Sequence, residues 1–457
     1  MRRGTLPAVP DVTLYDTRTR SLQRFEPRDP SRVGIYACGP TVYGRVHVGN
    51  ARPFIVFSQL KRFLVHEGYG VTYVGNITDI NDKIYDAAAK LGKPSAELAA
   101  EMAAAYIADT DRLGLGRPDA EPYASQYIDQ IIELIARLVE GGNAYACDGD
   151  VYFRVRTLDS YGQLSRRDLD QMDQGEGVEG ADRKEDPLDF ALWKATKEGE
   201  DTSWDSPWGP GRPGWHIECS AMAEALLGVE FDIHGGGVDL VFPHHENEAA
   251  QTLAARGRPL ARIWMHNGML ELGTEKMAKS VGNIRGLAEV LDDVGPEVLI
   301  LFMSTGHYRQ PLAFSDEALE DARRAANRIR EAGRRLLAGP SPAALEPYRD
   351  AFFAALRNDF NTAEALASLY GWIREANRSP EAVGDSHLRE MLDVLGLTGL
   401  LVAEEAAPPE AQELAAKRDE ARRNKDWGEA DRLRDELRAL GWEVRDGPDG
   451  PELVRAA

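Results

Sequence analysis

The sequence contains little cysteine, no long apolar run and no excess of basic residues. Its three cysteines, Cys38, Cys147 and Cys219, form no CxxC pair, which argues against a disulfide-held scaffold and favours a reducing compartment. No stretch approaches the roughly 20 apolar residues that a membrane-spanning helix needs, and Leu6–Pro10 is too short and too rich in proline for a signal peptide. We therefore expect a cytoplasmic protein with no membrane partner.

Acidic residues outnumber basic ones, with 75 Asp and Glu against 54 Lys and Arg and a net charge of −21. Proteins that coat nucleic acid non-specifically are basic, so we do not expect DNA as a partner. A local basic surface on an acidic chain can still bind RNA, because attraction depends on the local potential. The 43% hydrophobic and 28% charged residues are typical of a globular protein. The 457 residues are enough for about three domains.

Strand-like and helical patterns alternate near the N-terminus. A β-rich run over 33–38 is followed by helical apolar spacing over 51–67 and a second β-rich run over 71–77. This strand–helix–strand order predicts a βαβ unit, and hence an α/β fold with a Rossmann-like parallel sheet. The same character resumes over 231–268. Ligands of such a sheet bind at the carboxyl ends of its strands.

Changes in composition divide the chain into parts. The segment from Val151 to about Pro213 is rich in Gly, Asp, Pro and Trp, so we interpret it as an insertion in the nucleotide-binding domain. Amphipathic helices follow over 317–401, and a final unit begins with a helix and ends in Gly/Pro turns. The expected parts are a Rossmann-like catalytic domain in two halves (1–125 and 205–265), a connective insertion (126–204), a junction (266–316), an α-helical bundle (317–405) and a small C-terminal unit (406–457).

The first motif that carries chemistry is His47-Val48-Gly49-Asn50, between the first predicted strand and helix. Gly49 permits close approach of the backbone, and a helix N-terminus offers free N–H groups to an anion. His47 can donate a hydrogen bond to a phosphate oxygen. The alternative is a tight turn with a capping histidine.

The second motif is Lys276-Met277-Ala278-Lys279-Ser280, in a loop bounded by glycines. A pair of lysines can neutralise the charge that develops on a phosphoryl group during its transfer. The alternative is a solvated basic loop without a ligand.

A third group of residues has metal-ligand chemistry. Cys38 precedes the first motif, Cys219 lies in a helical pattern, and Pro243 begins the run Pro-His-His-Glu-Asn-Glu. If a helix starts at Pro243, His244 and Glu248 share one face. Two cysteines, a histidine and a carboxylate can hold zinc, with His245 as a rival ligand. The alternative is a pair of buried cysteines beside a polar helix cap.

The two motifs together resemble the HIGH and KMSKS signatures of the class I aminoacyl-tRNA synthetases. Longer runs extend the resemblance to the cysteinyl-tRNA synthetase family over essentially the whole chain. These runs are 38–43, 76–84, 212–222, 231–239, 243–248 and 276–280. One departure is Ala278, where the family usually has Ser. Both lysines are kept, so the role of the motif in stabilising phosphate charge is still expected.

The resemblance implies an ATP-dependent ligase that joins L-cysteine to tRNA(Cys) through cysteinyl-adenylate, with Mg²⁺ accompanying the ATP. It also implies one Zn²⁺ per chain, which selects the thiolate of the substrate because a hydroxyl group is a harder and less acidic ligand. The ligand set implied for this zinc is Cys38, Cys219, His244 and Glu248. We expect a monomer.

Further residues are expected to contact the substrates. Catalytic roles fall to His47, Asn50, Lys276 and Lys279. ATP contacts fall to His47, Asn50, Gly237, Asp239 and Lys279, and the amino-acid pocket to Thr41, Thr78 and Trp215. From chemistry alone, Asp239 can accept hydrogen bonds from ribose hydroxyls or cap the next turn. Trp215 can wall the pocket or pack in the core.

Contacts with RNA are expected in the C-terminal half. Six arginines between 323 and 335 lie on one predicted helix, where they can meet phosphates or pair with neighbouring acids. In the final unit, the resemblance assigns the anticodon to Trp427, Asp431 and Asp446. An aromatic ring beside basic residues can stack on an unpaired base. Trp427 can alternatively pack in the core of the small unit.

Two rival functions remain open at this point. A related ligase joins activated cysteine to an amino sugar and shares the catalytic domain and the zinc, but it lacks an anticodon unit, which residues 410–457 supply here. A zinc-dependent, nucleotide-binding RNA sensor without catalysis would not need His47 and Lys279, and both are present.

Overall fold

The computed structural model describes residues 11–169, 183–272, 275–276, 285–402, 408–447 and 450–455. Its centre is a four-stranded sheet in the order β10-β9-β3-β4, and each neighbouring pair is parallel. This arrangement confirms the parallel Rossmann-like sheet expected from the sequence. The strands are β3 Val33–Ala37, β4 Val71–Gly75, β9 Phe231–Gly237 and β10 Ala261–Asn267. A two-stranded antiparallel hairpin, β1 Thr13–Asp16 and β2 Ser21–Arg24, precedes this sheet along the chain.

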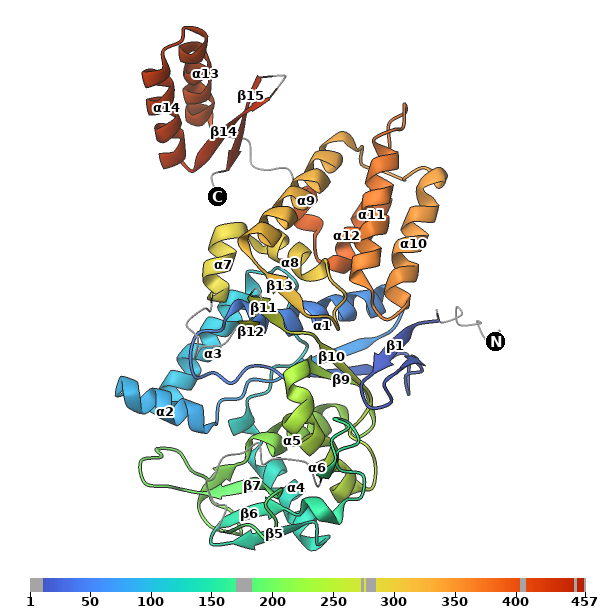
Figure 1. Ribbon diagram of the computed structural model, residues 1–457, viewed down its shortest axis with the longest axis vertical. Coiled ribbons are helices and arrows are strands. Elements are labelled where there is room, and N and C mark those ends of the chain that lie inside the picture. The colour runs from blue at the N-terminus through green and yellow to red at the C-terminus, as the bar shows by residue number, and fades with distance from the viewer. Residues whose placement is uncertain are drawn as a thin grey trace, which may run out of the picture.

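Both faces of the parallel sheet are covered by helices (Figure 1). Ile35 and Ile233 share one hydrophobic core with α1 (Val48–His66), whereas Tyr36 and Trp264 belong to a second core on the other face. All five residues of β3 are buried, as expected for a central strand of a two-sided sheet. The second face is covered by α4 Ile128–Glu140, α5 Trp215–Leu227 and α6 Glu246–Arg256.

Three helices, α2, α3 and α4, and a second sheet lie between β4 and α5 along the chain. The insertion contains an antiparallel sheet in the order β5-β6-β7-β8. This sheet ends at Pro213, past residue 204, where we expected the insertion to end. The elements are α2 Asp82–Leu91, α3 Ser95–Asp111, β5 Ala144–Cys147, β6 Asp150–Phe153, β7 Phe190–Ala195 and β8 Gly211–Pro213. Only Gly214 separates β8 from α5, so the insertion connects directly to a helix of the catalytic domain.

A small three-stranded sheet, in the order β12-β11-β13, lies at the junction with the bundle. β11 pairs in parallel with β13 and antiparallel with β12. The elements of this region are β11 Leu270–Leu272, β12 Glu275–Lys276, α7 Leu287–Val294, α8 Pro296–Ser304 and β13 Leu312–Phe314.

The helical bundle follows, as the amphipathic spacing predicted. Its helices are α9 Asp316–Arg335, α10 Glu346–Arg357, α11 Thr362–Ala376 and α12 Ser386–Leu395. One hydrophobic core is continuous from α1 through these helices, so the bundle and the catalytic sheet pack as one body. Among the described helices, none combines the length and the apolar character that crossing a bilayer requires.

The C-terminal unit has a hydrophobic core of its own and lies beyond the bundle (Figure 1). Its elements are α13 Pro409–Arg423, α14 Trp427–Ala439, β14 Trp442–Gly447 and β15 Gly450–Arg455. The expectation that this unit ends only in turns was wrong, because β14 and β15 form an antiparallel hairpin. Val444 faces Leu453 across the hairpin, and both pack against the buried ring of Trp442.

The separate core of this unit makes a prediction about stability. Trp442 is 3% exposed and Trp427 is 60% exposed. Replacing Trp442 with Ala should cost about 3–5 kcal/mol, a large loss for so small a core. Calorimetry of the whole chain should then show loss of the unit's unfolding transition while the main transition stays. Trp427→Ala is the matched control and should keep both transitions; an unchanged profile for Trp442→Ala would contradict the separate core.

Candidate active site and metal centre

The first motif forms the turn between β3 and α1. The N–H of Gly49 donates to His47 Nδ1 at 3.1 Å, and the N–H of His47 donates to Asn50 Oδ1 at 3.1 Å. This reciprocal capping starts α1 at Val48, earlier than the apolar spacing alone predicted. Because Nδ1 accepts a hydrogen bond, the neutral imidazole carries its proton on Nε2, where it can serve as a donor. The capping alternative and the phosphate-donor role are therefore compatible.

Gly49 and Asn50 have structural reasons to be present. A Cβ atom on Gly49 would lie 2.8 Å from the His47 ring, so a side chain there would displace the histidine. Asn50 orients His47 through its side-chain oxygen. Both residues thus hold the imidazole at the carboxyl end of β3.

The chain that follows the lysine motif contacts this turn. Lys276 is in β12, and residues 277–284, which include Lys279, lie outside the described residues. After them, the carbonyl of Arg285 accepts from the N–H of Val48 at 3.1 Å, and the N–H of Leu287 donates to the carbonyl of Val46 at 3.1 Å. The chain therefore returns from the lysine motif directly onto the first motif.

Four potential metal ligands form a buried cluster near the end of β3. The ligand atoms of Cys38, His244, His245 and Glu248 all lie within 4.8 Å of one another. Cys38 Sγ is 3.5 Å from His244 Nε2 and 3.5 Å from Glu248 Oε1, and His244 Nε2 is 3.0 Å from Glu248 Oε1. The structure thus brings together three of the four residues implied by the resemblance, along with the rival ligand His245.

Cys219 lies at the edge of this cluster. It is 1% exposed on α5 and shares a hydrogen bond with Cys38. It does not belong to the group within 4.8 Å, in which His245 is the fourth residue. Cys219 and His245 are therefore two candidates for one ligand position.

The helix that carries Glu248 begins later than expected. α6 starts at Glu246 rather than Pro243, and Val241–His245 forms a π-helical turn that is interrupted by an extended Phe242. His244 and Glu248 nevertheless face each other, because this turn continues into the helix. Apolar periodicity could not reveal the irregular turn, since its residues are mostly polar or aromatic.

Neighbouring side chains orient the ligands of the cluster. His244 Nδ1 lies 2.9 Å from His216 Nδ1, Glu248 Oε2 lies 2.8 Å from His234 Nε2, and His245 Nδ1 lies 2.7 Å from His266 Nε2. These contacts leave the remaining nitrogen or oxygen of each residue for the cluster. His245 Nε2 is buried and makes no hydrogen bond within the described part of the chain. Metal ligands are commonly held in this way by a second polar contact.

Burial sets the protonation of the cluster in the absence of a cation. It raises the pKa of the Cys38 thiol, with Cys219 and Glu248 adding to the effect. It lowers the pKa of His244 and of His245, and neighbouring histidines act in the same direction. Neutral imidazoles are ready to bind a metal, and a divalent cation would favour loss of the thiol protons. Sulfur, nitrogen and carboxylate donors together fit Zn²⁺.

His216 and His266 were not among the residues expected from the sequence. They contact His244 and His245, and His266 also contacts Thr17 Oγ1 at 2.8 Å. Five of the nine histidines of the chain gather here: His216, His234, His244, His245 and His266. Their spacing in the sequence carries no periodic signal, so only the fold brings them together.

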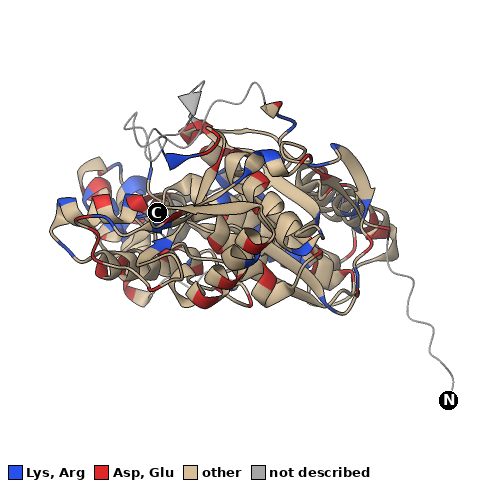
Figure 2. Ribbon diagram, turned by 90° about the horizontal axis from the view of Figure 1, so that it is seen from below, with Lys and Arg blue, Asp and Glu red and all other residues tan. Residues whose placement is uncertain are grey.

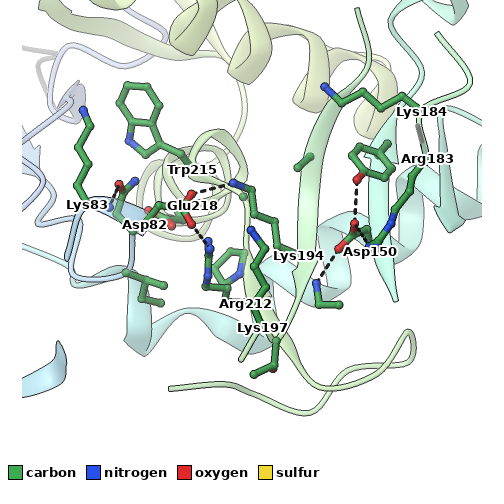
Figure 3. A pocket seen from close by; sticks show the side chains of 18 of the residues that line it. Asp82, Lys83, Asp150, Arg183, Lys184, Lys194, Lys197, Arg212, Trp215 and Glu218 are labelled. Carbon is green, nitrogen blue, oxygen red and sulfur yellow. Dashed lines mark hydrogen bonds and ion pairs between the residues drawn. The ribbon is translucent and has the colours of Figure 1, made fainter. Parts of the chain in front are cut away.

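A cavity of about 870 Å³ opens between the catalytic domain and the insertion (Figure 3). Thr41 and Trp215, which were predicted to border an amino-acid pocket, are in its wall. The Trp215 ring is half-buried and stacks on His244, with ring centres 4.1 Å apart, so the cavity reaches the metal cluster. Thr78 is 1% exposed and its backbone bridges to that of Thr41, which places it behind the wall.

Charged residues that the sequence did not single out form another part of this wall. Arg212 is 2% exposed and pairs with Asp82 and with Glu200, and Lys194 Nζ lies 2.9 Å from Asp82 Oδ2. Glu218 is fully buried, and burial raises the pKa of its carboxyl group well above the usual value. These residues come from separate segments, so no local motif could predict that they lie together.

The glycine-rich end of β9 lies next to the end of β3. A Cβ atom on Gly235 would lie 2.0 Å from Phe57, and one on Gly237 would lie 2.5 Å from Asp239 Oδ1. Asp239 is exposed in the short helix that follows β9. Its carboxylate therefore remains a candidate acceptor at the edge of the sheet that also carries His47.

In the C-terminal unit, the two tryptophans have different environments. Trp442 fills the core, whereas Trp427 is exposed at the start of α14. Asp431 lies one helical turn after Trp427 and pairs with Arg434 at 3.1 Å. Asp446 lies in β14. The alternative in which Trp427 packs the core is thus not what the structure shows.

The arginine-rich helix expected over 323–335 is present as α9. Arg323 pairs with Glu320 at 3.3 Å, and Arg324 pairs with Asp321. Figure 2 shows acidic and basic residues intermingled over the molecule. The arrangement in which these arginines pair with neighbouring acids therefore accounts for at least this part of the helix.

Known families match three parts of the chain. Residues 24–324 match the family described as tRNA synthetases class I (C) catalytic domain. Residues 351–399 match the DALR domain, and residues 404–452 match the cysteinyl-tRNA ligase anticodon binding domain. Together these matches span the catalytic sheet, the bundle and the C-terminal unit.

Curated relatives and solved structures agree with these matches. The cysteine–tRNA ligase of Chromohalobacter salexigens is 48% identical over 97% of this chain and 99% of the relative. That of Geobacillus thermodenitrificans is 45% identical over 98% of this chain and 99% of the relative. In fold, the chain is similar to a Mycobacterium tuberculosis methionyl-tRNA synthetase, with a TM-score of 0.60 at 17% identity over 81% of this chain and 89% of the other. The chain therefore belongs to the cysteine–tRNA ligase family of class I aminoacyl-tRNA synthetases.

Proposed function

We propose that the chain activates L-cysteine with ATP and Mg²⁺ and transfers the cysteinyl group to tRNA(Cys). In the first step, the cysteine carboxylate attacks the α-phosphorus of ATP, a carboxyl O–P bond forms, and pyrophosphate leaves. In the second step, the 2′-hydroxyl of the terminal adenosine attacks the carbonyl carbon, and AMP leaves. The observation that carries this proposal is that the chain after β3 places both the Cys/His/Glu cluster and the capped His47 turn, which the chain contacts again after the lysine segment.

For the sulfur end of the substrate, we propose a zinc site formed by Cys38, Cys219, His244 and Glu248. The second polar contacts that orient His244 and Glu248 support a cation at this place. When bound, zinc would supply a soft site that prefers a thiolate to a hydroxyl group. Trp215 closes the pocket beside His244, and it thereby limits the size of the accepted amino acid.

At the phosphate end of the site, Nε2 of His47 donates a hydrogen bond to a phosphate oxygen of ATP, and Asn50 holds the imidazole in place. Lys276 and Lys279 stabilise the charge that develops on the phosphates. Gly237 admits the adenosine to the backbone, and Asp239 accepts from the ribose hydroxyls. Thr41 and Thr78 border the amino-acid pocket. No covalent intermediate with an enzyme nucleophile is needed.

For the RNA, the cavity of about 870 Å³ is much larger than cysteine needs and leaves room for the terminal adenosine. The anticodon is read by the C-terminal unit through Trp427, Asp431 and Asp446. The exposed ring of Trp427 supports this assignment, because a base can stack only on an accessible ring. We expect the chain to work as a monomer in the cytoplasm.

The zinc assignment makes a prediction about two competing ligands. Cys219→Ser should abolish stoichiometric zinc, measured by elemental analysis, and should weaken cysteine binding far more than ATP binding. His245→Gln should keep the zinc, because His245 is not in the proposed set. Cys147→Ser is the matched control and should also retain the metal. Full zinc in Cys219→Ser, with loss in His245→Gln, would replace Cys219 by His245 as the ligand.

The lysine segment makes a kinetic prediction. Lys279→Ala should lower kcat for cysteine-dependent pyrophosphate exchange by about 10²–10³-fold, because a preorganised donor to the transition state is lost. The KM for ATP should change little, since the contact is made mainly in the transition state. Ala278→Ser should be nearly neutral. Near-normal exchange by Lys279→Ala would remove this residue from the mechanism.

The tail makes a prediction that separates activation from RNA recognition. A chain truncated after Leu401 should keep pyrophosphate exchange, which needs only cysteine, ATP and the catalytic domain, but should charge tRNA poorly. Trp427→Ala should reproduce part of the charging defect, since one stacked base contributes about 1–3 kcal/mol. Both assays are made on the same preparation. Equal losses in the two assays would mean that the unit is structural, and absence of cysteine-dependent exchange in the full chain would refute the proposed activity itself.

A further inference from the structure

Arg52 is a buried cation in the second turn of α1, one turn after the start of the helix at Val48. It is 1% exposed, although arginine is among the residues most rarely found in protein interiors. Among the described residues, its guanidinium group contacts backbone carbonyl oxygens rather than a carboxylate. Burial lowers the pKa of Arg52 to about 10, so the group is still charged near neutral pH.

The carbonyl groups come from two segments that lead into the small sheet. Nη1 of Arg52 donates to Gly268 at 2.7 Å and to Met269 at 2.9 Å, in the connection from β10 to β11. Nη2 donates to Tyr308 at 3.3 Å and to Gln310 at 2.7 Å, in the connection from α8 to β13. One side chain of α1 therefore joins both connections.

The two segments also contact each other closely at this point. The N–H of Gly268 donates to the carbonyl of Tyr308 at 2.8 Å. A Cβ atom on Gly268 would lie only 2.3 Å from the carbonyl oxygen of Gln310. Several carbonyl oxygens thus converge, and their mutual repulsion is offset by the positive charge of Arg52.

The small sheet carries the start of the lysine segment. β11 pairs with β13 on one side and with β12, which contains Lys276, on the other. The segment returns to α1 at Val48, through the carbonyl of Arg285. The first two turns of α1 therefore contact the chain that returns from the lysine segment, through Val48, and the connections that lead into β11 and β13, through Arg52.

We propose that Arg52 is a positioning residue for the activation step, which holds β11 and β13, and with them Lys276 in β12, in place relative to the His47 turn. This inference rests on the proposed function, because it assigns the lysine segment to the phosphates of ATP. Arginine suits the task because its planar fork presents several donors in fixed directions to separate carbonyl groups. A lysine keeps the charge but has a single nitrogen, so it cannot span both connections in the same geometry.

The test measures cysteine-dependent pyrophosphate exchange for Arg52→Lys. We expect kcat to fall by about 10- to 100-fold, since a misplacement on the order of 1 Å costs up to about 10²-fold. Zinc content and the KM for cysteine should stay near those of the unchanged protein, because the metal cluster lies on the other face of the sheet. Gln59→Leu is the matched control: Gln59 is also buried on α1 and donates to the Leu395 carbonyl at 2.9 Å, toward the bundle. Gln59→Leu should keep kcat within about 3-fold of that of the unchanged protein, but it should lower the melting temperature.

A double substitution distinguishes positioning from general stability. If Arg52 acts through the lysine segment, Arg52→Lys combined with Lys279→Ala should be no slower than Lys279→Ala alone by more than about 3-fold, because the effects of coupled residues do not add. A merely structural role would multiply the two losses. Gly268→Ala disturbs the contact between the two connections that Arg52 joins, so it should also lower kcat while zinc is retained. This variant provides the test if Arg52→Lys folds poorly.

The outcomes separate the two proposals. Exchange by the unchanged protein that does not depend on cysteine would refute the proposed function. Cysteine-dependent exchange by the unchanged protein, with kcat of Arg52→Lys within about 3-fold of it or with multiplicative losses in the double variant, would overturn the role of Arg52 alone.

Discussion

The parallel pairing of β3 between β9 and β4 is the constraint on which the rest of the site depends. β3 is buried along its whole length, so its register is set by side chains that fill a core on each face. Its carboxyl end delivers Cys38 to the metal cluster and, a short turn later, His47 to the start of α1. A shift of this strand by one residue would exchange its two faces and move both groups at once. The Cys/His/Glu cluster and the His47 turn are therefore placed by one strand.

Around this strand, polar groups are buried only where a partner orients them. His244, His245 and Glu248 are each held by another histidine, and the imidazoles stay neutral because burial lowers the pKa of His244 and His245. Such a network is costly in an apolar core unless each member is satisfied. One buried nitrogen, Nε2 of His245, is without a hydrogen bond in the described structure. A cation at the centre of the cluster would offset the cost of burying its ligands, which links metal binding to the stability of the whole domain.

The sequence predicted the parts of the fold that follow regular periodicity. The parallel strands around Ile35 and Ile233 and the amphipathic bundle helices were expected, because apolar spacing reports which faces are buried. The start of α1 was placed too late, since capping by His47 and Asn50 leaves no apolar signal. The hairpin after α14 was missed because its strands are short and rich in polar residues. The charged wall of the cavity was not predicted for another reason, because its residues come from distant segments and are brought together only by tertiary contacts.

The C-terminal unit has its own core yet belongs to the same chain as the catalytic sheet. Once one end of a long ligand is held at either place, the other end meets its site at an effective concentration set by the connection, not by the ligand's concentration in solution. Neither contact then needs high affinity by itself. A product can leave as soon as one contact opens, because the remaining weak contact dissociates quickly. Division into two independently packed bodies thus favours rapid turnover while it preserves recognition of the whole ligand.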